Sequence, residues 1–225
     1  MPSRLQSWVW VGGFVLAFVA GMTNVVGLFA FEHQAVSHLT GTASHLAAAL
    51  AQGDGVTMAR LAAVVAAFIA GAVISGMIIQ ASTLQLGRRY GAALLIESML
   101  LCAAAAMLQR HHVAGVYLAS GACGLQNAMA STYSGAIVRT THMTGIFTDL
   151  GILLGHRLRG MAVDWRRPAL FLLIITGFVA GGAAGAYAYP SLEHMTLLIP
   201  AGLTGMAGLG YYSYRLWKRR RQAQN

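Results

Sequence analysis

Two ionisable side chains, His45 and Asp149, lie at matched positions in two otherwise apolar stretches. Each follows a glycine, Gly41 or Gly145, by four residues, which is about one turn of a helix. An ionisable group at membrane depth usually marks a substrate or proton pathway, because its burial is costly. The pair could bind a substrate, carry a proton or form an ion pair. The alternative interpretation is a structural pair or an aqueous vestibule.

A threonine precedes each of these glycines, as Thr40 and Thr144. One interpretation is that each threonine caps a short helix, accepting a hydrogen bond from a free backbone N–H group. The other is that two broken helices turn their N-termini toward a polar or anionic ligand. Transporters built from repeats place half-helices at the membrane midplane in this way.

Amide side chains form a second set of candidates. Asn24 and Asn127 each end a Gly-x-x-Asn motif on a long apolar segment, and Gln126 precedes the second asparagine. Such amides either join helices by hydrogen bonds or contact a ligand near the centre of the molecule. Glu97 interrupts another apolar segment, where it either pairs with an arginine or a helix end, or binds a proton or an ion.

The composition predicts the kind of scaffold that positions these residues. Of the 225 residues, 57% are hydrophobic and 9% are charged, and the mean hydropathy is +0.62. Soluble domains carry about 25% charged residues, so residues 1–225 are predicted to form one multi-pass all-α membrane domain. The net charge of +9 fits basic loops on the cytoplasmic side better than nucleic-acid binding.

Two similar halves are predicted, at residues 8–109 and 113–217. Each half has a long span, a short apolar helix (40–51 or 144–155) and two further spans. A short helix of about twelve residues fits a re-entrant segment better than a full span. Six spans would make the halves inverted, whereas eight would make them parallel. With six spans and a cytoplasmic N-terminus, only Arg60 and Arg110 of the 15 basic residues lie outside, so both termini are predicted to be cytoplasmic.

Enzyme and metal motifs are absent from the sequence. It contains no His-Glu-x-x-His, Gly-x-Ser-x-Gly or Gly-x-x-x-x-Gly-Lys pattern. The two cysteines, Cys102 and Cys123, make no disulfide framework or metal pattern. We therefore expect neither an enzyme, nor a metal, nor a cofactor.

Four motifs stand out in the sequence: residues 21–24 (Gly-Met-Thr-Asn), 37–41 (Ser-His-Leu-Thr-Gly), 124–128 (Gly-Leu-Gln-Asn-Ala) and 139–145 (Arg-Thr-Thr-His-Met-Thr-Gly). They resemble those of the YoaK-type membrane family, DUF1275. The resemblance covers nearly the whole chain and implies a bacterial inner-membrane protein of several helices with no assigned activity. Two positions depart from the family pattern: Asn24 often corresponds to an acid, and Thr42 to an asparagine. If that acid carries protons or cations in relatives, Glu97 and Asp149 become the candidates here.

Two functions from different classes are compatible with these features. The first is a secondary transporter or permease for a small polar or anionic solute, with Glu97 and Asp149 as proton or ion candidates. The second is a structural or regulatory membrane protein that does not transport. The expected partners are the lipid bilayer and, through small-residue helix faces, a second copy of the chain. The substrate-site candidates are Asn24, Thr40, His45, Gln126, Asn127, Thr144 and Asp149.

Overall fold

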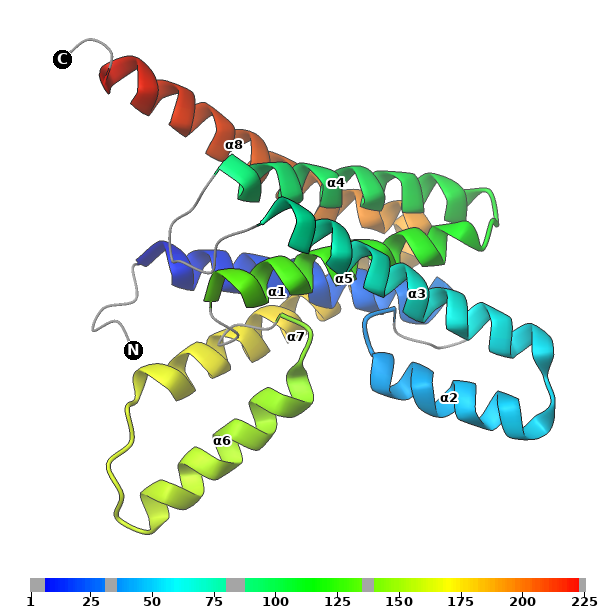
Figure 1. Ribbon diagram of the computed structural model, residues 1–225, viewed down its shortest axis with the longest axis horizontal. Helices are drawn as coiled ribbons and strands as arrows, with labels where there is room; N and C mark the ends of the chain where they lie inside the picture. The colour runs from blue at the N-terminus through cyan, green and yellow to red at the C-terminus, as the bar shows by residue number, and fades with distance from the viewer. Residues whose placement is uncertain (1–6, 31–35, 80–87, 135–139, 223–225) are drawn as a thin grey trace.

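The computed structural model describes residues 7–30, 36–79, 88–134 and 140–222, and every regular element in this part of the chain is a helix. It confirms the predicted all-α class (Figure 1). The elements, in chain order, are α1 (Ser7–Ala30), α2 (Leu39–Gln52), α3 (Gly55–Ile78), α4 (Arg88–Gln109), α5 (Ala114–Ser134), α6 (Met143–Leu158), α7 (Arg166–Leu192), a 3-10 helix η1 (Glu193–Leu197) and α8 (Leu198–Gln222).

Several of these helices are long and apolar enough to cross a membrane. By length and composition, four stretches of the described residues qualify, and the longest of them covers α7, η1 and α8 together. Helix α5 is not among them, because glycines, serines and amides lower its hydropathy. Most of its residues are buried. A helix surrounded by other helices tolerates such residues, since they allow close packing and interhelical hydrogen bonds. The four stretches are Val9–Ala30, Gly55–Ile78, Arg89–Gln109 and Arg166–Ser213.

Most of the long helices pack against helices that do not follow them directly in sequence. Helix α1 packs along α7, α3 along α5, and α4 along both α8 and α5. Glycines stand at the closest crossings. A Cβ atom on Gly21 would overlap the carbonyl of Phe178, and one on Gly124 would overlap the carbonyl of Phe68. The backbones therefore approach each other as closely as small residues permit.

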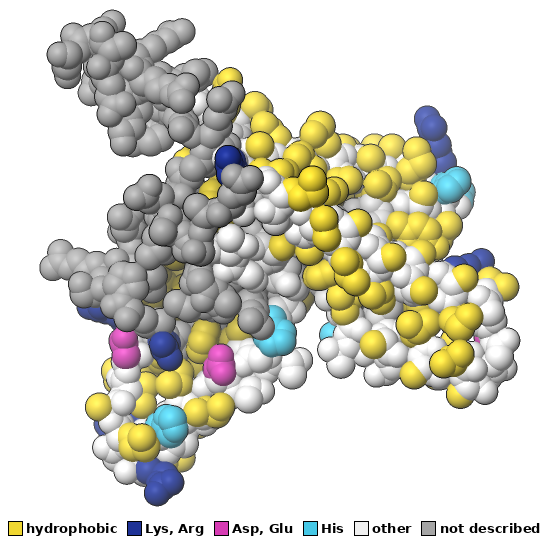
Figure 2. Space-filling view, in the orientation of Figure 1, with side chains coloured by type: hydrophobic (Ala, Val, Ile, Leu, Met, Phe, Trp, Pro, Cys, Tyr) yellow, Lys and Arg dark blue, Asp and Glu magenta, His cyan; other side chains and the backbone are white. Residues whose placement is uncertain are grey.

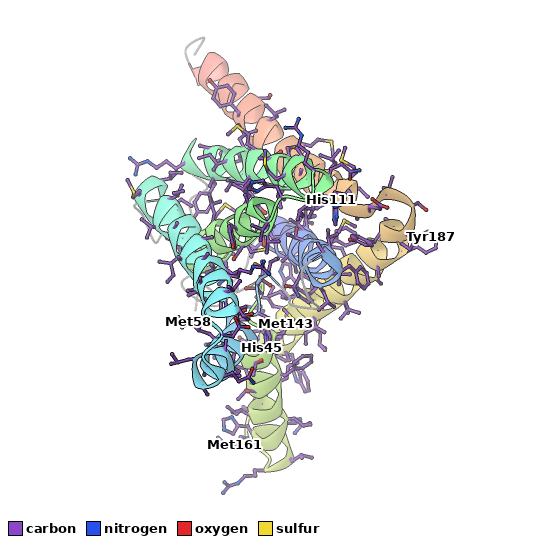
Figure 3. All side chains as sticks on the ribbon, turned by 90° about the vertical axis from the view of Figure 1, so that its right-hand side faces the viewer. His45, Met58, His111, Met143, Met161 and Tyr187 are labelled. Carbon is purple, nitrogen blue, oxygen red and sulfur yellow. The ribbon has the colours of Figure 1, made fainter. Side chains whose placement is uncertain are left out.

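The two short helices, α2 and α6, differ from the rest in length and direction. They have 14 and 16 residues, about 21 and 24 Å, which is shorter than a hydrocarbon core of about 30 Å. Their N-terminal ends face each other near the middle of the bundle, and their C-terminal ends point toward opposite ends of it (Figure 1). In the view along the bundle, His45 of α2 and Met143 of α6 lie on the same side of it (Figure 3).

Local residues explain where the first of these helices stops. Gly53 adopts a left-handed conformation, with φ +70°, and ends α2. The carboxylate of Asp54 then accepts a hydrogen bond of 3.1 Å from the backbone N–H of Thr57 and caps α3. Hydrogen bonds from the hydroxyl group and then from the backbone N–H of Thr57 lower the pKa of Asp54. The resulting turn lets α2 pack against α3.

Charged side chains and apolar side chains occupy different parts of the surface. Figure 2 shows apolar side chains over the face that α3 and α4 present, and basic side chains near the two ends of the bundle. The start of α1 and the end of α8 lie toward the same end of the bundle (Figure 1). This distribution is the one expected of a multi-pass protein with its helices across a bilayer.

Candidate functional site

A polar cluster lies inside the bundle around Gln126 of α5. The amide nitrogen of Gln126 donates to the carbonyl of Leu16 in α1 at 3.2 Å. Its amide oxygen accepts from the hydroxyl of Thr140 at 3.2 Å. Gln126 also hydrogen-bonds the carboxyl group of Glu97 in α4. One amide therefore joins two helices to the segment that leads into α6.

Every side chain of this cluster is buried. Glu97 is 2% exposed, Gln126 is 1% exposed, and Thr140 is fully buried. One carboxyl oxygen of Glu97, Oε2, has no hydrogen-bond partner. The thiol of Cys123, one turn before Gln126 on α5, is also buried and interacts electrostatically with Glu97. Among the described residues, Glu97 is the one acidic or basic side chain in the buried core. Its contact with Gln126 brings together two of the predicted candidates.

A second polar contact joins α1 to the segment that leads into α2. The side-chain oxygen of Asn24 accepts hydrogen bonds from the backbone N–H of Ser37 at 3.1 Å and from its hydroxyl at 2.7 Å. Ser37 is buried. Asn24 therefore acts as a structural hydrogen-bonding residue: it holds the chain where the chain turns back into the bundle.

Asn127, which matches Asn24 in the other half, differs from it in hydrogen bonding. The side-chain oxygen of Asn127 is buried and has no hydrogen-bond partner. A buried acceptor without a partner is unfavourable by about 1–3 kcal/mol. A structural hydrogen bond therefore accounts for Asn24 but not for the side-chain oxygen of Asn127.

We predict different effects of removing these two amides. Asn24→Ala is expected to lower the free energy of unfolding by about 1–3 kcal/mol, because Ser37 loses the acceptor for both its N–H and its hydroxyl group. Asn127→Ala is expected to change it by less than about 1 kcal/mol, because its oxygen has no bond to lose. Denaturant or thermal unfolding of the two detergent-solubilised variants measures the difference. Equal losses would show that Asn127 is as structural as Asn24.

The candidates on α2 and α6 lie outside the buried cluster. Thr40, His45, Thr144 and Asp149 are all exposed. His45 and Asp149 are both described and form no ion pair with each other in the structure. Thr40 and Thr144 lie in the first turns of the short helices and His45 and Asp149 near their middles, so none of the four belongs to the core of the bundle.

The interpretation of the two threonines as helix caps is wrong. The N-cap residues are His38 and His142, and neither makes a side-chain capping hydrogen bond. Thr40 and Thr144 lie inside the first turn, where their carbonyls accept from the hydroxyls of Ser44 and Thr148. Both short helices therefore begin one residue earlier than predicted and have no side-chain cap.

The histidines explain the glycines that follow them. The ring of His38 lies where a Cβ atom on Gly41 would be, and the ring of His142 lies at the same position over Gly145. The glycine therefore leaves room for an imidazole over the first turn. Both N-cap histidines are exposed, so each ring lies at the open end of its helix.

Sequence analysis missed two members of the site, Ser37 and Thr140. Each stands in the short segment before a Thr-Gly pair, and their positions in the two halves are not equivalent. The only feature of the sequence that could have indicated them was their place within the repeated motifs.

Among the described residues, no three His, Cys, Asp or Glu side chains come close enough to hold a metal ion.

Comparison with known proteins supplies one match. The family described as "Protein of unknown function (DUF1275)" matches residues 12–210. No curated protein and no solved structure matches the chain. The match covers both short helices, the polar cluster and both asparagines.

Proposed function

The chain belongs to the DUF1275 family, and we propose that it is a secondary transporter or channel-like permease for a small polar or anionic solute in a bacterial inner membrane. The observation that carries the proposal is the pair of short helices whose N-terminal ends face each other near the middle of the bundle (Figure 1). Uncapped helix N-termini present free N–H groups and positive partial charge to a ligand. Asn127, with its unpartnered oxygen, adds a polar group in the second half.

The re-entrant path of the chain supports this proposal. Asn24 lies six residues, or about 9 Å, before the end of α1. Its bond to Ser37 therefore brings the chain back along the bundle by about that distance after α1 has ended. Gln126 lies eight residues before the end of α5, so its bond to Thr140 returns the chain by about 12 Å. Each short helix then runs outward again. We infer six membrane spans, α1, α3, α4, α5, α7 and α8, with α2 and α6 as half-helices.

Matched helix crossings support an inverted repeat. Gly21 meets Phe178, and Gly124 meets Phe68. Gly124 lies 103 positions after Gly21, and Phe178 lies 110 positions after Phe68. The first helix of each half therefore packs on the third helix of the other half in the same way. Such exchanged packing is typical of transporters with a site at the repeat interface.

The same register holds where α4 meets α8. Gly208 approaches the backbone of Gly91, and the hydroxyl of Ser98 donates to the carbonyl of Ala201 at 2.7 Å. A shift of 110 positions carries Gly91 to Ala201 and Ser98 to Gly208. One contact is thus the repeat equivalent of the other, as a two-fold relation between the halves requires.

Accessibility of the turns after the short helices tests this topology. We predict that a single cysteine at Gln52 reacts with an impermeant thiol reagent on intact cells, whereas one at Met161 reacts only after permeabilisation. The reason is that six spans with a cytoplasmic N-terminus place the two exposed turns on opposite sides. Cys102 and Cys123 are replaced by alanine beforehand. Protection of both cysteines in intact cells would indicate eight spans and parallel halves.

Solute flux tests the proposed activity. Proteoliposomes are exposed to hyperosmotic gradients of formate, urea or glycerol, and light scattering follows their re-swelling. We predict that the wild-type protein accelerates re-swelling several-fold over empty vesicles for at least one of these probes. Asn127→Leu is expected to reduce that rate, because it removes the unpartnered polar group beside Gln126, whose side chain contacts the segment before α6. Gln109→Leu, at an exposed amide, is the matched control and should retain it.

Failure of this test has a defined meaning. If wild-type and empty vesicles re-swell at the same rate in every probe, a permease for these solutes is excluded. A stable stoichiometric complex with another membrane protein after mild solubilisation would then favour the non-transporting alternative.

A further inference from the structure

Glu97 is unusual among the acidic residues of this chain. It lies near the middle of α4, and one of its carboxyl oxygens has no partner. The other described acidic residues, Asp54, Asp149, Asp164 and Glu193, are exposed. An ionised carboxylate in an apolar interior is strongly unfavourable unless a cation or several donors compensate it.

The groups around Glu97 supply no such cation. Helix α4 packs against α3, α5, α8 and η1. From α5, Gln126 hydrogen-bonds the carboxyl group and Cys123 interacts with it electrostatically. Among the described residues, no other titratable or charged side chain of these elements is found to act on it. A proton is therefore the simplest compensating charge for this site.

The cluster has no counterpart in the other half of the repeat. The repeat positions equivalent to Glu97, Gln126 and Thr140 are Ala207, Thr23 and Val36. The hydroxyl of Thr23 is buried without a partner, and Val36 is buried in the apolar core. The other half therefore has apolar side chains at two of the three positions, and Ala207 is exposed where Glu97 is buried.

The hydrogen bonds of Gln126 connect Glu97 to the re-entrant segment. One N–H of the amide donates to Leu16, which leaves the second N–H as the donor for a Glu97 carboxylate. The amide oxygen meanwhile accepts from Thr140, two residues before the N-cap of α6. A protonated Glu97 becomes a donor and competes with Thr140 for that oxygen.

We propose that Glu97 binds and releases a proton during transport, and that Gln126 and Thr140 transmit its protonation state to the half-helix α6. This inference rests on the proposed function. In the step, a hydronium ion transfers a proton to one carboxyl oxygen: an O–H bond of the ion breaks and leaves water, an O–H bond to the carboxyl oxygen forms, and the charge of the side chain changes from negative to neutral. Release of the proton reverses these changes.

Infrared difference spectroscopy of the full chain in lipid nanodiscs tests the proton site directly. Between about pH 4 and pH 10, a range that covers shifted carboxyl groups, we expect a protonated-carboxyl C=O band that titrates in the wild type. The band should vanish in Glu97→Gln and persist in Glu193→Gln, the same substitution at an exposed carboxyl. Superimposable wild-type and Glu97→Gln spectra over this range would overturn the proposal.

Two further variants test the connection to α6. Thr140→Val introduces the residue type of the equivalent position, Val36, and removes the donor to Gln126. It should move the position or the titration midpoint of the Glu97 band, whereas Thr148→Val, on the exposed side of α6, should not. A band that Thr140→Val leaves unchanged would overturn the link through Gln126.

Solute flux separates this inference from the proposed function. For any probe that passes the wild-type protein, Glu97→Gln should remove the pH dependence of the rate, and Glu193→Gln should retain it. Unaltered pH dependence in Glu97→Gln would overturn the role of Glu97 while the permease stands. If no probe passes but the Glu97 band titrates, the transport proposal fails and the proton site is retained.

Discussion

Alanine at Gly124 is expected to lower the free energy of unfolding by about 1–3 kcal/mol, the range for overpacked cores. A Cβ atom there would overlap the backbone carbonyl of Phe68 on α3. A backbone carbonyl has no rotamer to change, so α3 and α5 must separate. Separation weakens the packing of α5 along its whole length, because α3 is one of its two main neighbours. The loss is measured by heating the detergent-solubilised protein and using size-exclusion chromatography to quantify the fraction that stays folded.

The same chain provides the control. Gly76 lies on α3, and a Cβ atom there would meet nothing within 4 Å. Gly76→Ala is therefore expected to be neutral or to stabilise the helix by up to about 1 kcal/mol. Gly21→Ala, at the repeat equivalent of Gly124, should be as damaging as Gly124→Ala because it would overlap the carbonyl of Phe178. Equal stability of Gly124→Ala and Gly76→Ala would show that α3 and α5 do not approach this closely.

Leucine at Gln126 is expected to destabilise the protein by about 2–4 kcal/mol. The substitution removes the donor to Leu16 and the acceptor for Thr140, and it leaves Glu97 without its hydrogen bond. Each buried group left unsatisfied is unfavourable by about 1–3 kcal/mol. The side-chain volume is nearly conserved, so a cavity contributes little to the loss. Chemical unfolding of the solubilised variant measures the difference.

Removing the partners as well should recover part of this loss. Replacing both sides of a buried polar contact by apolar groups of similar shape is nearly neutral, whereas replacing one side is not. The triple variant Glu97→Leu, Gln126→Leu, Thr140→Val is therefore expected to be more stable than Gln126→Leu alone. It should nevertheless lose the titrating infrared band. A triple variant less stable than the single one would argue that these residues do not form one hydrogen-bonded cluster.

The sequence alone determined the class of the protein and the positions of its two short helices. Charge-free runs of about twenty residues leave few alternatives to helices in a membrane, because each backbone polar group must be satisfied within its own segment. The spacing of the two His-x-Thr-Gly motifs located α2 and α6 to within a few residues, and the same motifs identified the family. These features are local, so composition and spacing are sufficient to find them.

Only the tertiary structure decided which polar residues meet. Gln126 and Thr140 are 14 positions apart, and Gln126 and Leu16 are 110 apart, so their contacts depend on how whole helices pack. The two asparagines of the repeated motif are indistinguishable by spacing, yet Asn24 is bonded to Ser37 and the oxygen of Asn127 has no partner. The physical reason is that helical periodicity and hydropathy are properties of one segment, whereas satisfaction of a buried polar group depends on its neighbours from other segments.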